Sequence, residues 1–129
     1  ESKILSSLFF DLEKLEWIGM KFDLLITPMV LHHVNDIDNI LSKFRNMIIP
    51  GGYLAVADLY PEDGSFHGEG FNGYKGFDIE ILSNKTQKLG FTDIIHKKCF
   101  AIRKETSDNT IKQFDIFLLT AKVDQNLAV

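Results

Sequence analysis

Histidine is the side chain that titrates nearest to neutral pH, and three of the four histidines lie where they could take part in chemistry. His67 lies in a glycine-rich stretch with acidic neighbours, a setting suited to contacting a substrate or accepting a proton as a general base. A loop that is simply solvated is the alternative interpretation of this stretch. His32 and His33 are adjacent and are expected to point in different directions at the start of a turn. The sequence indicates no third ligand near them, so no metal site is predicted.

Two apolar segments in the first part of the chain are predicted to be strands. The run from Ile4 to Phe10 predicts a short buried strand that ends at Asp11. Phe22 to Thr27 is apolar at nearly every position and is stopped by Pro28, which predicts a central strand. The carboxylate that ends the first strand would lie where open parallel sheets bind ligands.

A helix and another strand follow. Asn35 or Asp36 is suited to cap a helix, and Pro50-Gly51-Gly52 ends it. The apolar positions of this helix recur at the spacing of one helical face: Ile37, Ile40, Leu41, Phe44, Met47 and Ile48. Tyr53 to Leu59 then forms a second apolar strand. Strand, helix and strand in this order predict a right-handed parallel crossover.

The later part of the chain contains a long loop and a hairpin. Residues 60–76 are rich in glycine and polar residues, which predicts an irregular loop of a length that often carries function. Asp78 is expected to cap an amphipathic helix that Gly90 closes. Residues 91–104 and 112–123 both favour strands and are expected to form an antiparallel hairpin. Residues 124–129 are expected to be a disordered tail.

Composition excludes several classes of function. The 129 residues, 45% of them hydrophobic, suit one domain with one core. The net charge of −4, without a basic stripe, argues against nucleic acid as a partner. No apolar run approaches the roughly 20 residues of a membrane-spanning helix. A single cysteine, Cys99, excludes an intrachain disulfide and favours the cytoplasm.

Several motifs together resemble the class I S-adenosylmethionine-dependent methyltransferases. In that family an FDLI strand leads through an LHH turn into a helix that ends in PGG, and residues 22–34 and 49–54 carry these pieces. Residues 58–67 are similar to the corresponding segment of small-molecule enzymes of the methyltransferase 11/12 kind. Gly90-Phe91 resembles the family's closing motif. The resemblance implies an α/β Rossmann-like sheet, incomplete at its N-terminal side and ending in the antiparallel hairpin, with residues 1–123 as a partial methyltransferase domain.

The resemblance also implies a cofactor site for S-adenosylmethionine. It assigns Asp11 to the position that faces the adenine, where a carboxylate accepts a hydrogen bond from the exocyclic amine and the N–H of Leu12 can donate to a ring nitrogen. Thr27 and Met29 would lie beneath the methionine portion. A carboxylate that ends a strand is also a common turn former or helix cap, which is the alternative for Asp11.

One expected feature of the family is missing. Class I methyltransferases resemble dinucleotide-binding folds in their opening strand and glycine-rich turn, and no such turn precedes Asp11. In the family the missing strand lies beside residues 22–27, so its loss would expose an apolar sheet edge. The strand at residues 4–10, a second copy of the chain or a further N-terminal segment would have to cover that edge. We expect truncation combined with self-association.

The function implied by the resemblance is methyl transfer to a nucleophilic atom of a small-molecule acceptor, with His67 as the candidate base. Two alternatives remain. The first is a catalytically inactive remnant or partner-binding module that keeps part of the scaffold, which the absent glycine-rich turn supports. The second is a nicotinamide-dependent oxidoreductase, which the LHHV and PGG motifs argue against.

Overall fold

The fold is built around a strand, a helix and a second strand, as the sequence predicts. The computed structural model describes residues 4–126. Strands β1 (Phe22–Pro28) and β2 (Ile48–Leu59) pair in parallel, and helix α1 (Ile37–Met47) connects them. Asp36 begins α1 because its carboxylate accepts a hydrogen bond from the N–H of Asn39 at 3.0 Å.

The second half of the chain adds helix α2 (Ile79–Lys88) and the antiparallel hairpin of β3 (Phe91–Glu105) and β4 (Ile111–Val123). β4 pairs antiparallel with β2, so the described residues form a four-stranded sheet of order β1-β2-β4-β3. Asp78 caps α2 through hydrogen bonds from the N–H groups of Glu80 and Ile81, and Gly90 has a positive φ of 95° just beyond the helix. These elements confirm the predicted mixed α/β fold with its closing hairpin.

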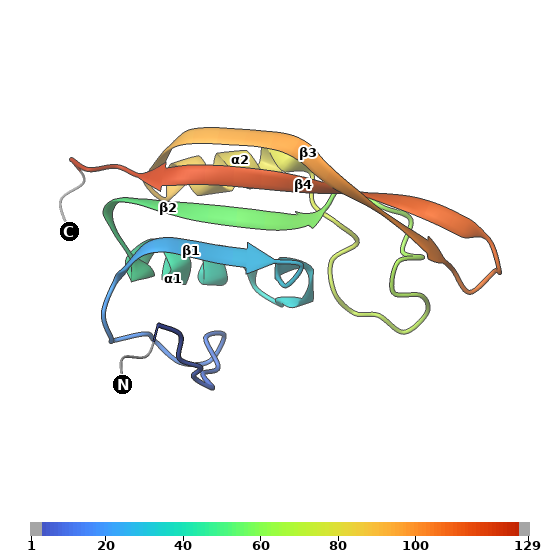
Figure 1. The fold of residues 1–129 in the computed structure, drawn as a ribbon, viewed down its shortest axis with the longest axis horizontal. Coiled ribbons are helices and arrows are strands. Elements are labelled where there is room, and N and C mark those ends of the chain that lie inside the picture. The colour runs from blue at the N-terminus through green and yellow to red at the C-terminus, as the bar shows by residue number, and fades with distance from the viewer. Residues whose placement is uncertain (1–3, 127–129) are drawn as a thin grey trace.

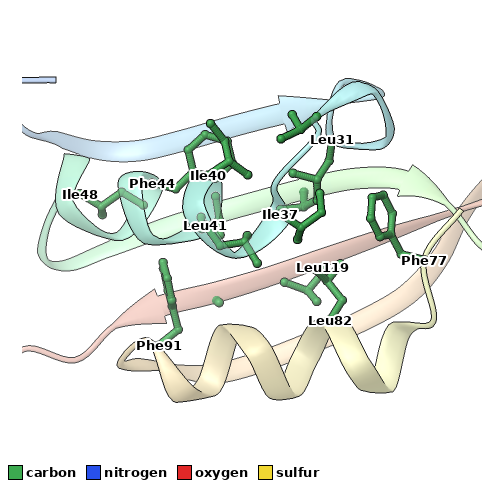
Figure 2. Close-up of a cluster of buried hydrophobic side chains, with 14 of the residues drawn as sticks. Leu31, Ile37, Ile40, Leu41, Phe44, Ile48, Phe77, Leu82, Phe91 and Leu119 are labelled. Carbon is green, nitrogen blue, oxygen red and sulfur yellow. The ribbon is translucent and has the colours of Figure 1, made fainter. Parts of the chain in front are cut away.

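Both helices cover the same face of the sheet (Figure 1). The main core lies between them and the sheet, where the apolar face of α1 meets side chains of β2, β4 and α2 (Figure 2). Each such Leu, Ile or Phe contributes about 1.5–3 kcal/mol when fully buried. Among the described residues, the largest fully buried apolar side chains are Leu31, Leu41, Ile48, Leu54, Val56, Leu59, Leu82, Phe91, Phe117, Leu119 and Val123.

Two strand predictions are wrong. Residues 4–10 form no strand: they are irregular and exposed, and in Figure 1 this segment lies below β1 without joining the sheet. β1 is an edge strand rather than a central one, with Leu24 and Ile26 more than half exposed. Both predictions fail for the same physical reason: an apolar segment becomes a buried strand only where neighbouring strands pair with its backbone N–H and C=O groups.

The last described residues follow β4 beside the start of β3. The N–H of Asp124 still donates to the carbonyl of Gly90 at 3.3 Å, and the last three residues of the expected tail lie outside the described part. Within residues 4–126 no helix is both long and apolar enough to cross a membrane.

Candidate active site

The carboxyl ends of β1 and β2 bring the potentially reactive side chains together. These two parallel strands end side by side, with Pro28 paired to Ala57. The short 3-10 turn η1 (Leu31–His33) follows β1, and Asp58 follows Ala57 in β2. Residues 60–76 then form the predicted long loop, without regular helix or strand.

A buried hydrogen-bonded pair of side chains anchors this region. Asp58 and His32 are 0% and 1% exposed, and the Nδ1 of His32 lies 2.6 Å from the Oδ1 of Asp58. The backbone N–H of His32 donates to the other carboxylate oxygen at 3.1 Å, and the N–H of Leu59 donates to Oδ1 at 2.7 Å. A buried carboxylate is costly unless it is paired in this way, so Asp58 depends on the turn that supplies two of its three donors.

His67 extends the pair to a chain of three groups. Its Nε2 lies 2.9 Å from the Nε2 of His32, so one of these nitrogens donates and the other accepts. Because Asp58 accepts from the Nδ1–H of a neutral His32, the Nε2 of that ring carries a lone pair and accepts from the Nε2–H of His67. This assignment follows from the hydrogen-bond network, and it leaves the Nδ1 of His67 with a free lone pair.

Aromatic rings surround His67 on the exposed side of the site. The ring of Phe71 stacks on it with centroids 4.0 Å apart, and Phe66 contacts it edge-on at 5.0 Å. These neighbours partly desolvate the imidazole, although the residue as a whole is exposed, and this lowers the pKa of His67. Positive charge on His32 or His33 lowers the same pKa further.

Close backbone contacts hold the loop of residues 60–76 against η1. The N–H of Tyr74 donates to the carbonyl of His32 at 2.9 Å. A Cβ atom on Gly73 would lie only 2.3 Å from that carbonyl oxygen, so the approach requires glycine. At the far side of the loop, Lys104 donates to the carbonyl of Phe66 and lies 4.5 Å from the centre of its ring.

A cleft beside the histidines contains most of the predicted cofactor residues. Its volume is about 540 Å³, and it is lined by residues 9–13, the carboxyl half of β1, the following turn and the inner face of α1. Asp11, Leu12 and Thr27 all lie on its wall. Met29 does not: its backbone has a φ of 53°, and its side chain packs against a small second cluster around Leu59.

Lys43 fixes the segment that forms one wall of this cleft. Its buried ammonium group donates to the carbonyls of Leu12, Glu13 and Leu15 at 2.6, 3.3 and 3.1 Å. The carboxylate of Asp11 accepts from the N–H of Glu13, as expected of a turn former. Turn formation and a ligand contact are compatible here, because the segment is irregular but anchored to α1.

Sequence reasoning missed Asp58 and dismissed His32. The argument that His32 and His33 diverge and have no third partner is wrong, because one nitrogen from each of His32, His33 and His67 lies within 4.8 Å of the others. The two adjacent rings have centroids only 4.2 Å apart. The available signal was Asp58 itself, since a carboxylate in an apolar strand needs a buried partner, and the turn after a parallel neighbour is the natural place for it.

Comparisons with known proteins agree with this architecture. Residues 2–56 match a family model described as a methyltransferase domain. An uncharacterized methyltransferase of Schizosaccharomyces pombe is 35% identical over 93 residues, which cover 64% of this chain and 33% of the yeast protein.

Solved methyltransferases share the fold at low sequence identity. Phosphoethanolamine N-methyltransferase 2 of Haemonchus contortus, in complex with S-adenosyl-L-methionine, superposes on 89% of this chain and 36% of its own, with 15% identity and a TM-score of 0.65. The N-methyltransferase NodS of Bradyrhizobium japonicum, in complex with S-adenosyl-l-homocysteine, gives 88% and 52% coverage, 16% identity and a TM-score of 0.59. The chain thus spans about a third of the length of the first relative in each comparison. Fold, motifs and matches together confirm the resemblance to the class I S-adenosylmethionine-dependent methyltransferases.

Proposed function

We propose that the domain of which this chain is part transfers a methyl group from S-adenosylmethionine to a small-molecule acceptor. One observation carries the proposal. The cleft with Asp11, Leu12 and Thr27 ends at Leu31, and the next residue, His32, begins the chain of hydrogen bonds to Asp58 and His67. A cofactor cleft and a group able to accept a proton therefore meet at the carboxyl ends of two parallel strands, where such folds bind ligands.

The cleft fits the adenosyl part of the cofactor. Its volume lies within the range of about 300–1,000 Å³ that is usual for small-molecule sites. Apolar side chains of α1 and β1 line one side, where a flat ring can pack, and Asp11 offers a carboxylate to an exocyclic amine. When bound, S-adenosylmethionine supplies an activated methyl group and its own leaving group. The chain's residues then have to orient the acceptor and remove its proton.

His67 is the proposed base. Its Nδ1 lone pair accepts the proton of an acceptor hydroxyl, amine or thiol as the methyl group is transferred. The Nε2–H of the same ring can then pass its proton to the Nε2 of His32, across the 2.9 Å contact. The positive charge comes to rest on His32, beside the buried carboxylate of Asp58.

The alternative of an inactive, partner-binding remnant is not favoured. The matched family model and the yeast relative are methyltransferases, and the chain keeps both the cleft and the buried pair of His32 and Asp58. The proposed acceptor is a small molecule that fits between the cleft and the loop of residues 60–76.

Isothermal titration of S-adenosylhomocysteine into the chain tests the cofactor assignment. We expect saturable binding that weakens about tenfold or more in Asp11→Asn, because a hydrogen bond to a charged group is worth about 1.5–3 kcal/mol. Asp23→Asn is the matched control, since Asp23 lies at the opposite end of β1. Equal binding by the Asp11 variant would overturn the role of Asp11, and a folded chain without saturable binding would mean that these residues do not form the cofactor site by themselves.

The role of His67 is tested by release of S-adenosylhomocysteine in the presence of EDTA, with acceptors that carry hydroxyl, amine or thiol groups. We expect His67→Ala to lower the rate by about 10²–10⁴-fold while the affinity for S-adenosylhomocysteine stays the same. His96→Ala controls for loss of an imidazole elsewhere, since His96 lies on β3 beside Glu80. An undiminished rate in the His67 variant would contradict the proposed base.

A further inference from the structure

We propose that His32, His33 and His67 form a binding site for a divalent transition-metal cation of the zinc type. One ring nitrogen from each of the three residues lies within 4.8 Å of the other two. Neutral imidazole is a preferred ligand of zinc, and three protein ligands with one open position is the usual arrangement of zinc in catalytic sites. Magnesium and calcium are disfavoured, because they prefer oxygen ligands.

The contact between His32 and Asp58 is a second observation that points to a cation. Histidines that bind metals almost always donate their other ring N–H to a carboxylate or carbonyl, which fixes the tautomer and orients the ring. His32 does this with its Nδ1, 2.6 Å from the fully buried Oδ1 of Asp58, and thereby directs its Nε2 toward the other histidines. The outer carboxylate of a metal site is therefore already in place.

The spacing of His32 and His67 needs only a small adjustment to accommodate the cation, whereas the third nitrogen, from His33, lies within 4.8 Å of these two and must settle at a similar spacing. Two imidazole nitrogens bound at about 2.0–2.1 Å in tetrahedral geometry lie about 3.3 Å apart, whereas the Nε2 atoms of His32 and His67 are 2.9 Å apart. The rings must separate by a few tenths of an ångström, and His67 must carry its proton on Nδ1 instead of Nε2. His32 is held by Asp58, whereas His67 belongs to an exposed loop segment, so the loop is expected to supply the movement.

The open fourth position faces the exposed side of the cluster. His33 and His67 are both exposed, whereas His32 lies at the buried end. A water molecule, or the oxygen or sulfur atom of an acceptor, would complete the coordination, and a bound cation lowers the pKa of such a group. This inference goes beyond the proposed methyl transfer. In a chain that carries the cation, His67 is a ligand and cannot serve as the base.

Titration of the chain with Co²⁺, and then with Zn²⁺ by calorimetry, tests the site without any need for cofactor or acceptor. We expect one cation per chain and a visible Co²⁺ absorption band typical of tetrahedral coordination. His67→Ala and His33→Ala should weaken binding by at least about 100-fold, since loss of an outer-shell partner alone typically costs 10–100-fold. Both residues are exposed, so these variants are expected to fold.

His96→Ala is the matched control, because it removes an imidazole from β3 outside the cluster, and its affinity should equal that of the unchanged chain. Asp58→Asn should weaken binding by about 10–100-fold if the carboxylate orients His32 toward a cation. Absence of one-to-one binding, or equal affinity in the His67 and His96 variants, would overturn the proposal. Either result leaves the binding of S-adenosylhomocysteine unchanged, so failure of the metal site is distinguishable from failure of the proposed function.

Discussion

At the scale of single residues, Asp58 is the side chain on which the site depends most. It has no exposed surface and receives hydrogen bonds from the side chain and backbone of His32 and from the backbone of Leu59. A buried carboxylate with three donors ties the end of β2 to the turn after β1. Asp58 therefore has a structural role and, in the proposed mechanism, an electrostatic role as well.

Asp58→Asn should lower the free energy of unfolding by about 1–3 kcal/mol. The amide oxygen can replace Oδ1, but the amide NH₂ then faces the backbone N–H of His32, and one buried donor loses its acceptor. Urea denaturation at pH 7, followed by circular dichroism, measures the effect. Asp23→Asn, on the exposed part of β1, should change the free energy by less than about 0.5 kcal/mol. Equal stability of the two variants would contradict the buried network.

At the scale of elements, a pattern in the sequence predicts the structure correctly where all of its residues lie within one segment. Asp36 and Asp78 both cap the helices that the sequence predicts, because a cap and an apolar stripe lie within one segment. The strand predicted at residues 4–10 is wrong, and so is the central place predicted for β1, because both depend on neighbours that composition cannot reveal. A strand's place in a sheet is a property of its partners.

The loop of residues 60–76 is positioned by Gly73. Gly73→Ala places a methyl group 2.3 Å from the carbonyl oxygen of His32, so the hydrogen bond from Tyr74 must lengthen or break. We expect a loss of about 1–3 kcal/mol in stability and a changed environment for His67, visible as shifted imidazole resonances in NMR spectra. Gly70→Ala places its methyl group in open space and therefore tests backbone strain alone at a φ of 83°. Unshifted His67 resonances in Gly73→Ala would show that the loop is positioned by other contacts.

The turn of the β3–β4 hairpin should weaken in acid. Hydrogen bonds from Thr106 and Thr110 lower the pKa of Asp108 to about 2, below the usual value of about 3.9. The unfolded chain therefore binds a proton before the folded chain does, and this contribution to stability, present above pH 4, is lost as the pH falls toward 2. Thermal unfolding between pH 2 and 5 should show a shallower dependence in Asp108→Asn. The difference between the unchanged chain and this variant isolates the contribution of Asp108 to stability from those of Asp63 and Asp115, whose pKa values are also lowered.

At the scale of the whole molecule, the candidate site combines what the sequence predicts with what only the fold reveals. The resemblance to methyltransferases predicted Asp11, Leu12 and Thr27, and all three line one cleft. The cluster of His32, Asp58 and His67 could not be predicted in the same way, since its members are 26 and 35 residues apart in the chain. Parallel strand ends and a returning loop bring them together, and no short-range pattern encodes that meeting.

The free edge of β1 leads to a prediction about assembly. In the described residues this strand pairs only with β2, and it carries Leu24 and Ile26 at 52% and 62% exposure. An exposed apolar edge invites pairing with another chain, so we expect the molar mass measured by light scattering to rise with concentration. The double variant Leu24→Lys and Ile26→Lys should stay monomeric, because charges on an edge strand oppose such pairing. The control is Ile111→Lys on the hairpin of β3 and β4, where the side chain is about as exposed as Ile26. This variant should associate like the unchanged chain. A constant monomer mass for the unchanged chain would contradict this prediction, because it would mean that the edge of β1 stays solvated without pairing with another chain.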